Sequence, residues 1–210
     1  MMKKILISIF LSLRFLKRII SSVYFFVSFK VLNFILPNLN KVFSGRLIYA
    51  RIPRCQQKTI ITGKGEVSIG NHCRFGFRPG GFHRKGCIEI QPRYQNAIIK
   101  IGNDVSTNNN IFICAARCIE IGDHTLIGQN VTLMDFEAHG IPPGERHKTG
   151  EIGSIKIGNN VWIGNNVTIL KNSEVGDNTI VATGAVVSGK FPANVIIGGV
   201  PAKIIKSIDS

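Results

Sequence analysis

A repeat of six residues is the feature that most constrains how this chain can fold. From Ile157 onward an aliphatic residue occupies every sixth position, and the same spacing connects Ile121, Ile127 and Leu133. The positions of the C-terminal run are Ile157, Ile163, Ile169, Val175, Val181 and Val187. A period of six fits neither the 3.6-residue turn of a helix nor the two-residue alternation of a flat strand. It indicates a polygonal coil in which each side contributes one inward aliphatic residue.

Glycine follows the aliphatic position in most repeats, and Asn or Asp comes next, as in Gly158–Asn159 and Gly176–Asp177. We expect each pair to form a turn that tolerates positive φ. Smaller or β-branched residues four places after the aliphatic one are expected to point inward as well: Val131, Val161, Val167, Ser173, Thr179 and Ala185. A weaker, offset series runs through Ile101, Thr107, Ile113 and Ile119. Stacked coils of this kind bury a continuous aliphatic column, as in solenoid proteins.

The segment LMDFEAHGIPPGERHKTGEIG, residues 133–153, interrupts the repeat. Extra residues add nothing to a coil whose core is already filled, and long loops in compact repeats usually carry function. This loop contains His139 and His147. A neutral imidazole can accept a proton near neutral pH, so these histidines are candidates for a general base, although a single histidine on a loop is more often simply exposed to solvent.

The repeats, densest in IKIGNNVWIGNNVTILKNSEVGDNTIVATGAVVSGK, resemble those of the hexapeptide-repeat acyltransferases. The resemblance extends from about Ile60 to Ile205 and is strongest to the sugar and polysaccharide O-acetyltransferases, such as galactoside and maltose acetyltransferases. It implies an all-β fold, a left-handed parallel β-helix over residues 46–210 with a catalytic loop at 134–156. It also implies a homotrimer with active sites between subunits, acetyl-CoA as acyl donor, a sugar or polysaccharide hydroxyl as acceptor, and no metal.

The resemblance also implies roles for individual residues. The histidine that the family carries on its extended loop corresponds to His139, the general base that takes the proton of the acceptor hydroxyl. Glu137 or Asp135 would orient the imidazole, and His147 is the second candidate for the base. Asn108 matches an asparagine that faces the acceptor hydroxyl.

Further positions match the groove in which the family binds the cofactor. Trp162 corresponds to a tryptophan near the acyl group, and Lys203 and Lys206 fall where basic residues meet the adenosine phosphates. The positions expected to line the pantetheine arm are Asn165, Thr183, Gly184 and Ser188.

Several alternative functions share features of this sequence. An N-acetyltransferase acting on a nucleotide amino sugar and a serine acetyltransferase would keep the fold and the donor. A γ-type carbonic anhydrase would need three converging histidines around zinc, and only His124 and His139 form a pair that could meet. A scaffold without catalytic activity would not need a loop that carries histidine.

The charge of the chain is concentrated at its beginning. The whole sequence has a net charge of +14, yet residues 1–58 contain eleven Lys and Arg and no Asp or Glu. These cations alternate with apolar runs such as ILISIFLSL, which is followed by RFLKR and not by the small residues of a signal-peptide cleavage site. The apolar window of residues 19–36 contains Lys30 and is short for a membrane span.

We therefore expect residues 1–45 to form a basic, apolar helical segment at a membrane surface, where its cations meet anionic lipids. A helix packed on its own domain or on a neighbouring subunit is the alternative. Nucleic acid is not an expected partner, because the cations do not alternate with polar and stacking residues. The five cysteines form no C-x-x-C pair, and we expect them to be small buried residues of a protein in a reducing cytoplasm. Together with the basic helical segment, this predicts a location at the inner face of the cytoplasmic membrane.

Overall fold

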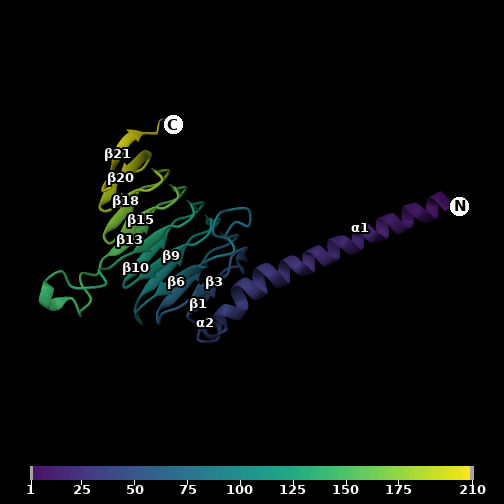
Figure 1. The fold of residues 1–210 in the computed structure, drawn as a ribbon, viewed down its shortest axis with the longest axis horizontal. Coiled ribbons are helices and arrows are strands. Elements are labelled where there is room, and N and C mark those ends of the chain that lie inside the picture. Colours follow the sequence, from purple (N-terminus) through teal and green to yellow (C-terminus); the bar gives the residue numbers. More distant parts are fainter. Residues whose placement is uncertain (1, 209–210) are drawn as a thin grey trace.

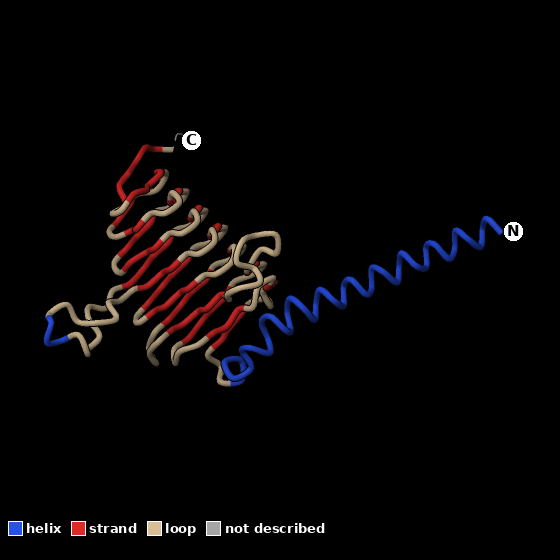
Figure 2. The backbone as a smooth tube through the Cα atoms, viewed as in Figure 1, coloured by secondary structure: helices blue, strands red, loops and turns tan. Residues whose placement is uncertain are grey.

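A computed structural model describes the backbone of residues 2–208 and the side chains of residues 14–208. The body is a three-sided prism of parallel strands, and one long helix leaves one end of it (Figure 1). Strands form the faces of the prism and turns form its corners (Figure 2). The prism is the parallel β-helix that the repeat predicts, and it is left-handed, as in related hexapeptide-repeat structures.

Each face of the prism is one sheet, and successive strands of the chain pass from face to face. Sheet A contains β1 (Leu47–Tyr49), β4 (Glu66–Ile69), β7 (Ile98–Ile101), β10 (Cys118–Ile121), β13 (Ser154–Ile157), β16 (Ser173–Val175) and β19 (Lys190–Phe191). Sheet B contains β2 (Arg54–Cys55), β5 (Arg74–Phe75), β8 (Ser106–Thr107), β11 (Leu126–Ile127), β14 (Trp162–Ile163), β17 (Ile180–Val181), β20 (Val195–Gly199) and β21 (Ala202–Ser207). Sheet C contains β3 (Thr59–Ile61), β6 (Ile88–Pro92), β9 (Phe112–Ala115), β12 (Thr132–Met134), β15 (Thr168–Leu170) and β18 (Val186–Val187). Only the last pair, β20 and β21, is antiparallel among these strands.

The predicted aliphatic column forms the core. Every position of the C-terminal run from Ile157 to Val187 is buried, and so are the inward residues predicted four places later. Parallel pairing places equivalent residues above one another, as Ile99, Ile119 and Ile155 of sheet A show. Fully burying such a side chain contributes about 1.5–3 kcal/mol, so the column is the main source of stability of the prism.

The turns differ from the prediction in one respect, because glycine does not carry the positive φ. The left-handed residue is the one two places after glycine, such as Asn160 with φ 54° and Asn178 with φ 56°. Glycine is needed because the next coil lies too close: a Cβ atom on Gly158 would lie 2.3 Å from a carboxylate oxygen of Asp177. Asparagine tolerates the left-handed region, which explains its frequency at these corners.

The helical segment consists of α1 (Met2–Phe26), the π-helix η1 (Val27–Ile35), the 3-10 helix η2 (Leu36–Asn38) and α2 (Leu39–Phe43). Its C-terminal part closes the open end of the aliphatic column. Phe34 is fully buried there, and the amide nitrogen of Asn38 donates to the carbonyl oxygen of Thr59 (2.9 Å), while its oxygen accepts from the N–H of Ile61 (2.6 Å). The packed alternative therefore holds for this part of the segment.

The preceding part of the helix extends away from the prism into solvent (Figure 1). Its exposed apolar side chains include Phe15, Leu16, Ile19, Ile20, Val23, Tyr24, Phe26 and Val27. Residues 14–43 form the one described helix that is long and apolar enough to cross a membrane, and 6% of its most apolar window is buried.

A second excursion from the coils, which the repeat analysis did not anticipate, lies at residues 76–87 between β5 and β6. Two buried side chains hold it. The amide nitrogen of Asn109 donates to the carbonyl oxygens of Phe77 and Gly81, both at 2.8 Å, and that of Gln57 donates to the carbonyl oxygen of Phe82 at 2.8 Å. We call residues 76–87 the basic loop, because it contains Arg78, Arg84 and Lys85.

Candidate functional site

Residues 135–153 leave the prism between β12 of sheet C and β13 of sheet A and form a narrow arm (Figure 1). Its two sides are joined as in a hairpin: Phe136 and Ile152 form an antiparallel bridge, and the N–H of Gly140 donates to the carbonyl oxygen of Lys148 at 2.9 Å. The 3-10 helix η3 (Pro143–Glu145) forms the tip. The interruption of the repeat is therefore an ordered arm.

His139 lies on this arm with an exposed side chain. Its Nδ1 atom is 2.6 Å from the carbonyl oxygen of Arg146. A carbonyl oxygen can only accept a hydrogen bond, so Nδ1 carries the proton and Nε2 of the neutral ring holds the free lone pair. Among the described residues no partner of Nε2 is found, and this atom is the one available to accept a proton.

The two acidic residues expected to orient His139 have other partners. Asp135 is fully buried, and its carboxylate accepts the backbone N–H groups of Ala116, Arg117 and Cys118 at 2.6, 3.0 and 2.8 Å. Burial raises the pKa of its carboxyl group, and these hydrogen bonds oppose that change. Glu137 lies 3.3 Å from the amine of Lys171 and accepts the N–H of Glu151 at 3.3 Å. Both residues fix the root of the arm, whereas a backbone carbonyl orients the imidazole.

Lys171 is a residue of this region that the sequence did not single out. Its amine bridges Glu137 and Glu151 on the two sides of the arm. Hydrogen bonding to Lys171 lowers the pKa of Glu151, and the same contact raises the pKa of Lys171. The only sign of this role in the sequence was that Lys171 follows the strand one coil after the strand that precedes the arm. That position becomes informative only when the coils are known to stack, because β15 then lies beside β12.

On sheet B a cleft of about 460 Å³ collects several other predicted residues. Asn108, Trp162 and Asn165 line it. Trp162 is 55% exposed, and the side-chain oxygen of Asn165 accepts the N–H of Gln129 at 2.9 Å. The volume lies within the range of small-molecule sites, which is about 300–1,000 Å³. We call this the sheet B cleft.

Arg54 and Arg74 also line the sheet B cleft and were not predicted. The guanidinium of Arg54 lies over the rings of Phe25 and Phe29 of the helix, 4.5 and 5.6 Å from their centroids, and its Nε atom is buried without a hydrogen-bond partner among the described residues. Arg74 donates from Nε to the hydroxyl of Ser106 at 3.2 Å. Their spacing of twenty residues places them on adjacent coils, which only the fold reveals.

The remaining predicted positions lie on three different parts of the prism. Thr183 and Gly184 follow β17 at the corner next to Asn165, where the N–H of Gly184 donates to its carbonyl oxygen at 2.9 Å. Ser188 follows β18 on the corner between sheets C and A, the same corner from which the arm leaves. Lys203 and Lys206 are exposed on β21 at the C-terminal end.

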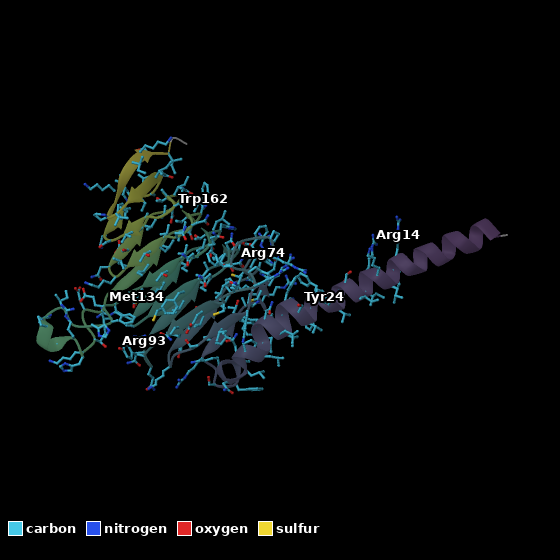
Figure 3. All side chains as sticks on the ribbon, viewed as in Figure 1. Arg14, Tyr24, Arg74, Arg93, Met134 and Trp162 are labelled. Carbon is cyan, nitrogen blue, oxygen red and sulfur yellow. The ribbon has the colours of Figure 1, made fainter. Side chains whose placement is uncertain are left out.

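Within a single chain, His139 therefore does not lie at the sheet B cleft. Figure 3 shows Trp162 and Arg74 on the side of the prism from which helix α1 departs, whereas Met134, at the root of the arm, lies on the opposite side. Apart from Lys203 and Lys206 at the C-terminal end, the predicted site residues form two groups: Asn108, Trp162, Asn165, Thr183 and Gly184 on one side, and Glu137, His139 and Ser188 on the other.

Cysteine and metal chemistry add no further site. All five cysteines are free, and burial raises the pKa of Cys55 to about 12 and those of Cys73 and Cys114 to about 11. Within residues 2–208, no group of three His, Cys, Asp or Glu side chains is placed to hold a metal ion.

Comparisons with known proteins agree with the fold and the repeat. Residues 154–189 match the family model "Bacterial transferase hexapeptide (six repeats)". The galactoside O-acetyltransferase of Escherichia coli K12 is 40% identical over 113 residues, which is 53% of this chain and 55% of the relative. WbbJ of the same organism, a candidate lipopolysaccharide biosynthesis O-acetyl transferase, is 35% identical over 125 residues, or 54% of this chain and 62% of the relative.

Among solved structures, a galactoside acetyltransferase in complex with coenzyme A aligns with a TM-score of 0.51 and 37% identity, covering 53% of this chain and 56% of that one. The resemblance to the hexapeptide-repeat acyltransferases is thereby confirmed, and the matches include galactoside O-acetyltransferases. The chain spans between 55% and 62% of the length of the two curated relatives.

Proposed function

We propose that this protein is an O-acetyltransferase that moves an acetyl group from acetyl-CoA to a sugar hydroxyl during the assembly of cell-surface polysaccharide. The names of the relatives and the coenzyme A complex of the solved structure support the reaction class. In the proposed step, Nε2 of His139 takes the hydroxyl proton while the oxygen attacks the thioester carbonyl carbon. The carbon–sulfur bond then breaks, and the sulfur of coenzyme A leaves with that proton.

The observation that carries the proposal is the division of the predicted residues between two sides of the prism. The arm extends away from its own sheet B cleft, and Nε2 of His139 is free among the described residues. A homotrimer would place the arm of one subunit against the sheet B cleft of the next, so that His139 and Asn108 of one site come from different chains.

Mixing two inactive variants tests this arrangement. Purified His139→Ala and Asn108→Ala subunits are unfolded together, refolded together and assayed with acetyl-CoA and a galactoside. Random trimers restore roughly one quarter of the sites, because each site needs one intact arm and one intact cleft from different subunits. If the mixture is no more active than the separate variants, the shared site is refuted.

The acceptor class is tested by the same assay with purified glycans. Transfer to a sugar hydroxyl supports the proposal, whereas transfer only to an amino group or to serine would support an N-acetyltransferase or a serine acetyltransferase.

We further propose that the protein lies at the inner face of the cytoplasmic membrane through the exposed part of its N-terminal helix. The exposed apolar side chains and the cations Arg14, Lys17 and Arg18 support this, because an interfacial helix buries the first and presents the second to headgroups. Replacing Ile20, Val23 and Val27 together with glutamine should move the protein from the membrane fraction to the soluble fraction. The cap formed by Phe34 and Asn38 is untouched in this variant, so an unchanged distribution would refute the proposal.

A further inference from the structure

The net positive charge of the molecule comes from its first 87 residues. Residues 1–87 contain sixteen Lys and Arg against one Asp or Glu, whereas residues 88–210 contain ten against eleven. The first group comprises the helix, the first two coils and the basic loop. The excess charge therefore belongs to the helix and to the end of the prism from which the helix departs (Figure 1).

At this place the helix and the basic loop enclose a cleft of about 390 Å³, which we call the junction cleft. Its cationic lining comes from Lys58, Arg78 and Arg84, with His83 beside them, and Tyr24 and Ser28 contribute from the helix. No Asp or Glu is among the described residues that line it. No ion pair is found for Lys58, Arg78 or Arg84 within the part of the chain whose side chains are described.

The junction cleft is held in shape by the body. The N–H of Arg78 donates to the side-chain oxygen of Gln56 at 2.7 Å, and the Gln57 amide donates to the carbonyl oxygen of Phe82 at 2.8 Å. Asn33 of the helix donates to the carbonyl oxygen of Cys55 at 2.9 Å, which fixes the helical wall. These hydrogen bonds fix the backbone of the basic loop and the helical wall, from which the exposed side chains of Lys58, Arg78 and Arg84 extend.

His83 also lines the junction cleft, and its ring is half-buried. Its Nδ1 atom is buried and has no hydrogen-bond partner among the described residues. A ligand in the cleft can therefore reach this ring only through its other nitrogen, Nε2.

An apolar groove continues from the junction cleft along the helix. It is lined by Ile19, Ile20, Val23, Val27 and Leu32, and it shares Tyr24 and Ser28 with the cleft. A ligand that occupies both must combine an anionic group with a hydrocarbon chain, and this combination excludes free nucleotides and nucleic acid.

We propose that the junction cleft binds the phosphate group of an anionic membrane lipid whose acyl chains lie along the apolar groove. The proposal rests on the proposed membrane contact of the helix and adds to it a site with defined chemistry. It also fixes how the body stands on the membrane: the sheet B cleft shares Gln56 with the junction cleft and so opens close to the headgroups.

Vesicle co-sedimentation of the full chain tests the proposal, with phosphatidylcholine vesicles compared with vesicles that also contain phosphatidylglycerol. The double variant Lys58→Gln with Arg84→Gln should lower partition onto the anionic vesicles by roughly 30-fold, the loss expected for two cations at an anionic surface. The matched control, which we call the sheet A control, is Arg117→Gln with Lys156→Gln; it removes one exposed cation from the bend before β10 and one from β13 of sheet A. It should change partition by no more than about twofold, because charges beyond a Debye length of about 8 Å are screened.

The variant His83→Phe separates a binding site from general attraction, since it removes the ring nitrogens and leaves the three cations in place. Partition should fall by roughly fivefold, the contribution of one hydrogen bond. Equal losses in the cleft variant and the sheet A control, or no loss in His83→Phe, would overturn the proposal.

Two further measurements identify the source of the phosphate and separate the lipid-site proposal from the acetyltransferase and membrane-contact proposals. Inorganic phosphate should not displace the protein from anionic vesicles beyond the effect of chloride at the same ionic strength; selective displacement would identify a soluble phosphate ligand and overturn the lipid proposal. Acetyl transfer to a soluble galactoside is measured in the same preparations. An inactive wild-type protein would refute the acetyltransferase proposal and leave the lipid result standing, while binding of wild type to neutral vesicles tests the helix alone.

Discussion

The Nδ1 atom of His139 lies 2.6 Å from the carbonyl oxygen of Arg146, across the arm that leaves the prism. This contact sets the tautomer of the ring by a backbone group, so the direction of the free lone pair depends on the shape of the arm. Asp135, Glu137 and Glu151 have a different task, which is to hold the root of the arm. The catalytic competence that we propose for His139 thus depends on an ordered hairpin outside the repeat.

Removing the imidazole should abolish most of the acetyl transfer. General-base catalysis contributes typically about 10²- to 10⁴-fold in rate, so His139→Ala should lower kcat by that factor while binding of acetyl-CoA changes little. Steady-state kinetics and calorimetric titration measure the two quantities. His147→Ala is the comparison on the same arm, and a larger loss in His147→Ala than in His139→Ala would assign the base to His147.

The tether between the arm and the coils should weaken in acid. The hydrogen bond from Lys171 holds the pKa of Glu151 below its ordinary value of 4.5, so the tether is present at neutral pH and is lost as the pH falls below that value. Hydrogen exchange of the arm amides, corrected for the intrinsic effect of pH, should show increased opening there. In Glu151→Gln the arm should already be loosened at neutral pH.

Glu174→Gln is the control for this experiment. Glu174 is paired with Lys190 at 2.7 Å on sheet A and has no ion pair with the arm among the described residues, so its removal should leave arm exchange unchanged. Equal exchange in wild type and Glu151→Gln at neutral pH would show that the tether does not order the arm.

The aliphatic column should account for most of the stability of the coils. Ile99 is fully buried, and its neighbour Ile98 on the same strand is 36% exposed. Truncation of a buried isoleucine to alanine costs about 2–5 kcal/mol, so Ile99→Ala should lower the free energy of unfolding by that amount. Ile98→Ala should cost clearly less, as measured by urea denaturation of both variants. Similar losses would mean that burial in the inward column is not the main source of stability of the coils.

The corner asparagines make a separate prediction about the backbone. Asn178 has φ 56° and lies in a ladder, accepting from Asn160 and donating to Asn194, both at 2.9 Å. Asn178→Ala and Asn178→Gly lose the same two hydrogen bonds, but alanine is also strained by about 1–2 kcal/mol in the left-handed region. Thermal or urea denaturation should therefore show a higher free energy of unfolding for Asn178→Gly than for Asn178→Ala. The reverse order would show that the backbone conformation is not the limiting factor at this corner.

The sequence determined the parts of this protein that repeat. A period of six assigns each aliphatic residue to the interior, because equivalent residues of stacked coils fall above one another, and this is why Ile157 to Val187 could all be placed correctly. It also marked the arm, since an interruption stands out only against a regular pattern. Around Gly76 to Gly86 the pattern was already irregular, and the basic loop therefore escaped notice.

Tertiary structure decided which residues meet. Gly158 is required by a neighbouring coil, Asp135 binds three backbone N–H groups of a turn nearly twenty residues earlier, and Arg54 and Arg74 share a cleft with Trp162. None of these contacts is local in the chain, so no pattern of neighbouring residues encodes them. The positions of His139 and of the sheet B cleft on opposite sides of the prism follow from the same cause: a repeat specifies the distance of each residue from the axis, whereas the side on which it lies depends on every turn that precedes it.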